Sequence, residues 1–213
     1  MQRIVIIDYH MGNLRSVCKA LEHVSDDGTE VIVSSDAATI RAADKVVFPG
    51  QGAARDCMAE IHRLDLAQCI REVLDDRPFL GICMGLQVLL EVSEESPQSP
   101  CLGAIAGRVR RLPARDAAGH PITIPQMGWN QVWRAAQHPL WHGIADGERS
   151  YFMNSYYADP DDPKLVMART PYGLNFACAL GNDHMFAVQF HPEKSQHAGL
   201  GLLANFTRWD GQI

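Results

Sequence analysis

Short apolar runs alternate with amphipathic stretches over the first ninety residues. The apolar runs suit buried strands and cover residues 4–7, 30–33, 45–48 and 79–82. Between them, apolar positions recur every three or four residues, which predicts helices at 14–24, 37–43, 53–74 and from Leu86 to about Val92. Alternation of strands and helices at this spacing is typical of an α/β fold, with an open, mostly parallel sheet flanked by helices.

The pattern changes after residue 93. Residues 94–100 are polar and contain proline, and from 102 to 180 the segments are short, rich in Val, Ile, Tyr and Trp, and broken by Gly and Pro. This pattern predicts antiparallel strands and hairpins appended to the parallel sheet. A last apolar strand is predicted at 186–190, and Ser195 is the predicted N-cap of a final helix. We interpret residues 1–213 as a single domain.

A cysteine lies where a predicted strand meets a predicted helix. The sequence Gly81-Ile82-Cys83-Met84-Gly85 is a cysteine version of the G-x-S-x-G nucleophile elbow. At such a turn the central residue is strained and points outward, close to a helix N-terminus that favours a thiolate. Cys83 is therefore the candidate nucleophile. The structural alternative is an inert cysteine in the core.

A cysteine nucleophile needs a base and an acid. Of the nine histidines, His191 alone follows an apolar strand directly and has a carboxylate, Glu193, two residues on. Glu193 would hold the imidazole in the correct tautomer, and an ordinary histidine pKa of about 6.5 predicts loss of activity below about pH 6. The alternative for this segment is a solvated turn.

A glycine-containing loop also ends a predicted strand. Gly50 and Gly52 flank Gln51 after Pro49, and their peptide groups could form an oxyanion hole together with the N–H of Met84. A plain strand-to-helix turn is the alternative. A phosphate-binding loop is disfavoured because no Lys-Ser/Thr pair follows the glycines.

Composition narrows the classes of function. The net charge is −6 without a basic block, which argues against nucleic-acid binding. Six scattered cysteines without a C-x-x-C pair fit a reducing compartment, and no window is long enough to span a membrane. The histidines lack metal-ligand spacing. We expect a cytoplasmic enzyme without a metal or a cofactor.

Several segments resemble a known family. GICMGLQ at 81–87 and QFHPE at 189–193 resemble the class I, triad-type glutamine amidotransferases, whose fold is flavodoxin-like. MGNLRSV at 11–17, MGWN at 127–130 and HPEKS at 191–195 are similar to segments of the glutaminase subunits of imidazole glycerol phosphate synthase within that family. The resemblance covers the whole chain.

The resemblance implies a reaction. Cys83 would attack the side-chain amide of L-glutamine to form a thioester, and His191, oriented by Glu193, would move the protons. Gln87 and Glu91, one turn apart on the predicted elbow helix, would hold the substrate. The ammonia would pass to a (β/α)8-barrel cyclase subunit that makes imidazole glycerol phosphate and aminoimidazole carboxamide ribotide in histidine biosynthesis.

The resemblance also implies a heterodimer with that cyclase. Asn13, Trp129, Asn130 and Lys194 lie in segments expected at the contact, and a tryptophan suits an interface anchor. A buried tryptophan in the appended sheet is the alternative for Trp129.

The chain departs from the family pattern at four positions. Gln126 and Asn154 stand where the family usually has histidine, His10 stands where a small residue is common, and Gln51 replaces a valine. None of these removes a triad member. Two alternatives stay open: a glutaminase that serves another ammonia-accepting synthase, and a catalytically silent scaffold that only binds a partner.

Overall fold

The computed structural model describes residues 1–213 and has one large mixed sheet. Its strand order is β2-β1-β3-β4-β13-β12-β10-β6-β5, with β11 beside β12 and β8 beside β11. The strands are β1 Gln2–Ile7, β2 Thr29–Ser34, β3 Lys45–Gly50, β4 Phe79–Cys83, β5 Val92–Ser93, β6 Gly107–Arg111, β8 Trp133–Arg134, β10 Tyr156–Pro160, β11 Val166–Pro171, β12 Asn175–Gly181 and β13 Met185–Val188. Strands β1, β2, β3, β4 and β13 are parallel, which confirms the predicted α/β class.

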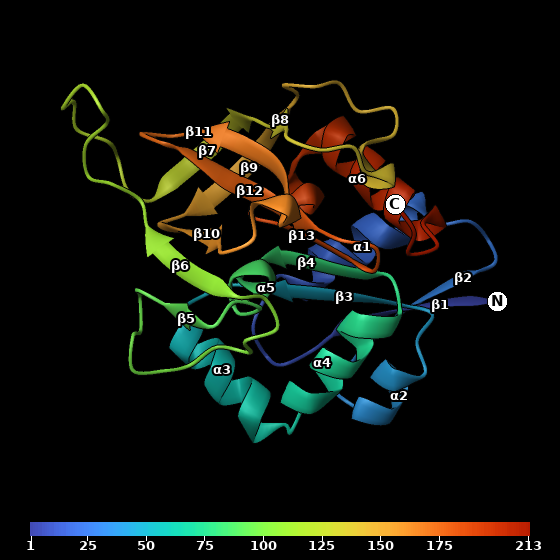
Figure 1. Ribbon diagram of the computed structural model, residues 1–213. Helices are drawn as coiled ribbons and strands as arrows, with labels where there is room; N and C mark the ends of the chain where they lie inside the picture. The colour runs from blue at the N-terminus through green and yellow to red at the C-terminus, as the bar shows by residue number, and fades with distance from the viewer.

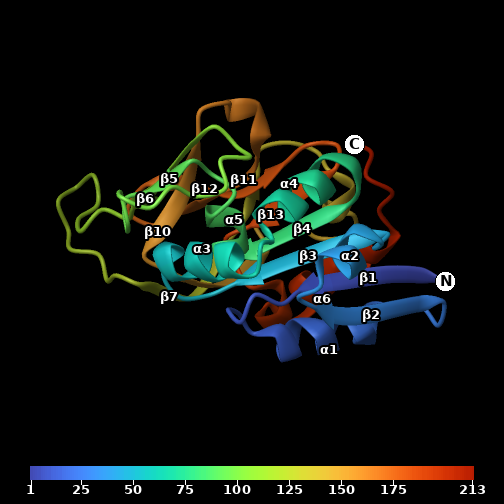
Figure 2. The ribbon, with the colours of Figure 1, turned by 90° about the horizontal axis from the view of Figure 1, so that it is seen from below.

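Helices cover both faces of the parallel part (Figures 1 and 2). One face carries α2 Ala37–Arg41, α3 Ala54–Arg63 and α4 Ala67–Asp76, and the other carries α1 Leu14–Val24 and α6 Gln196–Arg208. Strand β1 shows why its sequence is continuously apolar. Val5 and Ile7 enter the core cluster on the first face, while Ile4 and Ile6 enter the cluster on the second. Three short 3-10 helices complete the elements: η1 Pro139–Trp141, η2 Pro163–Leu165 and η3 Pro192–Lys194.

The second half of the chain forms the predicted antiparallel strands. Most of them extend the large sheet, because β12 pairs antiparallel with β13 and β10. Only β7 Gln126–Gln131 and β9 Arg149–Asn154 form a separate two-stranded ribbon. The loop between β6 and β7 projects from the body as a long arm at the left of Figure 1.

The predicted elbow helix is much shorter than expected. Helix α5 covers only Met84–Gln87. The N–H groups of Leu89 and Leu90 donate to carbonyl groups only three residues back, and the N–H of Glu91 donates to the Gly107 carbonyl instead of continuing the helix. The apolar spacing after Leu86 therefore reflects a buried turn, and the prediction of a helix through Val92 is wrong.

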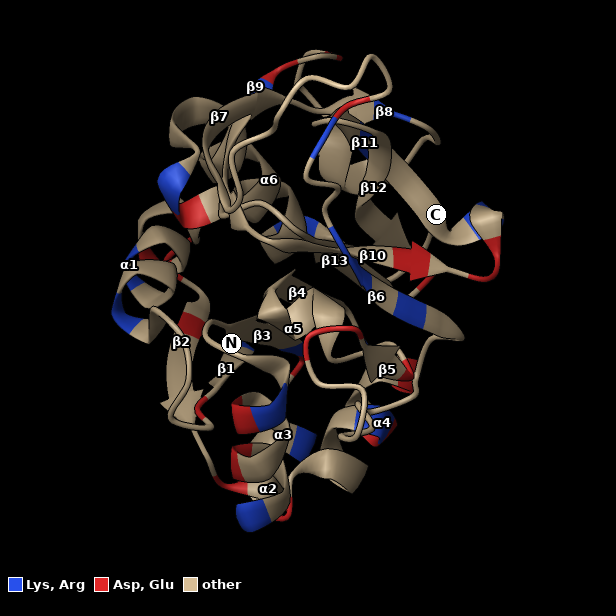
Figure 3. Ribbon diagram, turned by 90° about the vertical axis from the view of Figure 1, so that its left-hand side faces the viewer, with Lys and Arg blue, Asp and Glu red and all other residues tan.

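Charged residues of both signs are interspersed on the outer helices. Figure 3 shows Lys and Arg next to Asp and Glu along α1 and α3. No helix is long and apolar enough to cross a membrane.

Candidate active site

Cys83 lies at a strained turn between β4 and α5. Its backbone has φ 56° and ψ −107°, a combination that non-glycine residues rarely adopt. The turn is also crowded, because a Cβ atom on Gly85 would lie 1.8 Å from the carbonyl oxygen of Phe48 in β3. Only glycine lets α5 begin this close to the neighbouring strand. The geometry is that of the nucleophile elbow predicted from the sequence.

His191 follows β13, the strand next to β4, so the neighbouring strands bring Cys83 and His191 to the same edge of the sheet. The Nδ1 atom of His191 lies 2.9 Å from Glu193 Oε1, and the two side chains are only 5% and 1% exposed. Burial disfavours the imidazolium, but the Cys83 sulfur and the Glu193 carboxylate outweigh it and raise the pKa of His191 to about 10. The resting site has no Cys83–His191 hydrogen bond of normal geometry, and Nε2 is unpaired.

Cys83 and His191 line a cavity of about 220 Å³. Two further lining groups have buried, unpaired oxygen atoms, Gln87 Oε1 and Asn154 Oδ1. Gln87 is fixed in place because its Nε2 donates to Gln189 Oε1 at 2.9 Å and to the Tyr156 carbonyl at 3.1 Å. Buried polar atoms without partners are costly. The cavity is therefore prepared for a ligand with several hydrogen-bond donors.

The carboxylate that lines this cavity is Glu95, not the predicted Glu91. Because α5 ends at Gln87, Glu91 does not lie one helical turn further on the same face, and its Oε2 accepts from the Gly107 N–H at 3.1 Å. Glu95 reaches the cavity from the loop after β5, where its Oε2 also accepts from the Ala54 N–H at 2.8 Å. No helical or strand periodicity in the sequence pointed to a residue in this loop.

The predicted oxyanion loop lies beside the nucleophile. Gly50 is the register partner of Cys83 in the β3–β4 pair, and Gln51 and Gly52 line the cavity. A Cβ atom on Gly50 would meet the Tyr9 hydroxyl at 2.2 Å, so the close approach requires glycine. Burial raises the pKa of Cys57 to about 12, so it stays a thiol and donates to the Gln51 carbonyl at 3.4 Å.

The predicted interface residues separate into two groups. Trp129 is 44% exposed on the outer face of β7, which excludes the buried alternative. Lys194 is half-buried, with its ammonium 6.0 Å from the centroid of the Tyr151 ring. Asn130 points to the opposite face of β7, where its Nδ2 donates to the Pro171 carbonyl at 2.8 Å. Asn13 lies at the start of α1 without capping it, next to Gly12, which packs close to Gly50.

The residues that depart from the family pattern lie around the site. Gln126 and Asn154 are register partners across the β7–β9 ribbon, and both are buried. His10 has φ 63°, and its Nδ1 lies 3.1 Å from Glu60 Oε2 and 2.8 Å from Arg63 Nη2 on α3. His10 therefore links the loop after β1 to the helix that follows the oxyanion loop.

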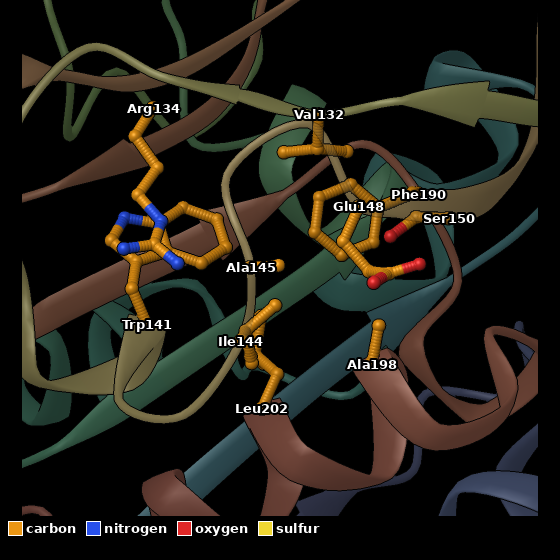
Figure 4. A pocket seen from close by; sticks show the side chains of 10 residues that line it. All are labelled: Val132, Arg134, Trp141, Ile144, Ala145, Glu148, Ser150, Phe190, Ala198 and Leu202. Atoms are coloured by element: carbon orange, nitrogen blue, oxygen red, sulfur yellow. The ribbon is translucent and has the colours of Figure 1, made fainter.

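A second cavity, which reaches Phe190 next to His191, is small and mostly apolar. It encloses about 10 Å³ and is lined by side chains such as Val132, Trp141, Phe190 and Leu202 (Figure 4). It is lined by no cysteine or histidine, and this volume accommodates a single water at most. The cavity at Cys83 is the better candidate for chemistry.

The fold and the elbow agree with the comparisons to known proteins. The family model described as glutamine amidotransferase class-I matches residues 5–208, and the chain belongs to this family. A solved structure of a glutamine amidotransferase covers 92% of the chain with a TM-score of 0.69 at 18% identity, and PurLQS from Thermotoga maritima covers 98% with a TM-score of 0.70 at 17%. At these identities the two structures support the fold alone.

Within that family the chain falls among the HisH subunits of imidazole glycerol phosphate synthase. It is 56% identical to subunit HisH 1 of Pseudomonas aeruginosa, over 100% of this chain and 99% of that protein. It is 54% identical to HisH of Nitrosococcus oceani over 99% of both chains. The predicted family resemblance is confirmed, and with it a glutamine amidotransferase subunit.

Proposed function

We propose that the chain hydrolyses L-glutamine through Cys83, His191 and Glu193. Cys83 transfers its proton to His191, and the resulting thiolate attacks the side-chain amide carbon. The N–H of Met84 together with the Gly50–Gly52 loop stabilises the oxyanion. The His191 imidazolium protonates the departing nitrogen, so that ammonia leaves and a thioester remains. His191 then takes a proton from water, which attacks the thioester and releases glutamate.

The cavity chemistry supports glutamine as the substrate. The α-ammonium group of an amino acid carries three donors and a positive charge, and the cavity offers the Glu95 carboxylate and the unpaired oxygens of Gln87 and Asn154. Gln189 Nε2 contacts the Cys83 sulfur at 3.7 Å and joins the nucleophile to Gln87. The observation that carries the proposal is the unpaired His191 Nε2 in the same cavity as the strained Cys83.

The ammonia passes, in this proposal, to a (β/α)8-barrel cyclase subunit in histidine biosynthesis in the cytoplasm. The docking face is the outer face of the β7–β9 ribbon, which includes Met127, Trp129, Tyr151 and Met153. Met127 is 61% exposed, an unusual state for a large apolar side chain next to Trp129. Met153 also lines the catalytic cavity, so the docking face is continuous with the site of ammonia release.

The direct test is glutamate release by the purified chain, measured with and without the cyclase of the same organism. We expect the cyclase to stimulate hydrolysis, and the two proteins to co-elute as a heterodimer. Substitution of Cys83 separates a glutaminase from a silent scaffold, because a scaffold does not depend on that sulfur.

The pH profile tests the role of His191. Because its surroundings favour the charged form, the imidazolium is present at neutral pH and is lost as the pH rises through its pKa of about 10. We therefore expect kcat/KM for glutamine to fall as the pH rises on the alkaline side, above the usual histidine range, whereas the sequence alone predicts a fall on the acid side below about pH 6. A loss of activity as the pH rises through 6 to 7, with the fold intact, would contradict this assignment.

Replacement of Trp129 tests the docking face. We expect Trp129→Ala to weaken cyclase binding about 30-fold, the effect of losing an interface anchor worth roughly 2 kcal/mol. Unstimulated glutamate release should be unchanged. Trp133→Ala is the matched control, because Trp133 is 43% exposed but lies on β8, outside the ribbon. Equal Kd values for the two variants, measured by titration calorimetry, would exclude the ribbon as the docking face.

A further inference from the structure

Ser195 occupies the N-cap position of α6 but does not cap the helix with its side chain, contrary to the sequence prediction. Its hydroxyl donates to the carbonyl of His191 at 2.6 Å and accepts from the N–H of Tyr151 at 2.9 Å. The side chain is almost completely buried, with 1% of the residue exposed. A buried hydroxyl with both hydrogen bonds directed to the main chain holds its two partners in a fixed relation.

A third hydrogen bond closes these two into a ring that joins Ser195, His191 and Tyr151. The N–H of His191 donates to the carbonyl of Tyr151 at 2.9 Å. Both main-chain polar groups of Tyr151 are thus bound to the catalytic segment 191–195, and both main-chain polar groups of His191 are bound in return. The ring fixes the backbone from which the imidazole extends to Glu193 and toward Cys83.

The Tyr151 side chain connects this ring to the docking face. Its ring lies edge-on to Trp129, with centroids 5.9 Å apart, and the Lys194 ammonium lies 6.0 Å from its centroid. A strand residue places its side chain on one face and its main-chain groups in the plane of the ribbon. A displacement of the Tyr151 ring at the docking face would therefore reach His191 by two routes, one direct main-chain hydrogen bond and the Ser195 hydroxyl.

We propose that Ser195 is a positioning residue that holds the His191 imidazole in place toward Cys83. Through Tyr151 it also couples the position of His191 to the docking face. The coupling to the docking face rests on the proposed function, whereas the positioning of His191 can be tested without glutamine or cyclase. Ser195 does not line the substrate cavity near Gln87 and Glu95.

The first measurement is the pH dependence of Cys83 alkylation by iodoacetamide, followed on the Cys83 peptide by mass spectrometry. In Ser195→Ala the imidazole is held less firmly, and we expect the pH of half-maximal reactivity to move upward relative to the parent. Ser195→Thr keeps a hydroxyl and should restore the parent profile. Thr207→Ala is the matched control, since Thr207 is another buried hydroxyl on α6 that donates to a main-chain carbonyl.

The second measurement is glutaminase kinetics with and without the cyclase. We expect Ser195→Ala to lower the stimulated kcat about tenfold, since small displacements of a catalytic group are costly, with little change in KM or in the Kd for the cyclase. Thr207→Ala should reduce thermal stability without that loss. If Ser195→Ala keeps the parent alkylation profile and kcat, its role is structural only and the proposal is overturned.

The two proposals fail differently. If the parent chain neither hydrolyses glutamine nor binds the cyclase, the proposed function is wrong, and the alkylation profile alone still decides whether Ser195 positions His191. If the parent is stimulated normally and Ser195→Ala is stimulated by the same factor, the coupling is wrong while the proposed function stands.

Discussion

Replacing Cys83 by glycine is expected to abolish glutamine hydrolysis and to make the protein more stable. Loss of the sulfur removes the proposed nucleophile, the only thiol that lines the cavity. Loss of a nucleophile in comparable enzymes costs roughly 10⁴-fold or more in kcat. Stability rises because φ 56° with ψ −107° is strained for any residue with a Cβ atom. Strain of this kind costs about 1–3 kcal/mol, partly offset by the greater chain entropy of unfolded glycine.

Cys83→Ala separates the two effects. It also lacks the sulfur, so its activity should be lost equally, but it keeps the Cβ atom and the strain. We expect Cys83→Gly to exceed Cys83→Ala in free energy of unfolding by about 1 kcal/mol in urea titrations. A Cys83→Ala variant that hydrolyses glutamine at the parent rate would refute the proposed chemistry, and equal stabilities would show that the elbow is not strained.

Glu95→Gln is expected to raise the KM for glutamine about 100-fold, because a charge-assisted hydrogen bond to the α-ammonium group is worth roughly 2–3 kcal/mol. The amide keeps a carbonyl oxygen to accept from the Ala54 N–H, so the loop should stay in place. The chemical step does not involve this carboxylate, and kcat should change by less than about threefold.

Glu91→Gln is the matched control for the substrate contact. Glu91 also lies in the segment after α5, but its carboxylate binds the Gly107 N–H outside the cavity. Its KM should equal that of the parent. Steady-state kinetics of the two variants show which carboxylate binds the substrate. A raised KM in Glu91→Gln, or an unchanged KM in Glu95→Gln, would indicate that Glu91 and not Glu95 makes this contact.

The sequence predicted the parallel half of the fold well, because those strands are buried on both faces. The apolar runs at 4–7 and 79–82, each flanked by predicted helices, indicate buried strands, and both lie in strands. The elbow was equally visible, since glycines on both sides of a cysteine at a strand end have a specific steric purpose. The likeness to class I glutamine amidotransferases rested on such local motifs and is confirmed.

The errors have a common physical cause in tertiary hydrogen bonding. Leu86 to Val92 has helical spacing, yet the N–H of Glu91 donates to the Gly107 carbonyl rather than to a carbonyl one helical turn back. Ser195 is in a good capping position, yet its hydroxyl binds His191 and Tyr151. Glu95 could not be identified from the sequence, because its position depends on a hydrogen bond to the N–H of Ala54, which lies several elements earlier in the chain. Local sequence patterns do not show which groups from distant parts of the chain will form such hydrogen bonds.

The central position of β13 has a consequence for biosynthesis of the protein. This strand is inserted between β4 and β12, so the histidine that follows it joins the nucleophile only after nearly the whole polypeptide has left the ribosome. A nascent or truncated chain that ends before Met185 carries the sulfur without its base. On the proposed function, such an incomplete chain would hold Cys83 without His191 and would release no ammonia.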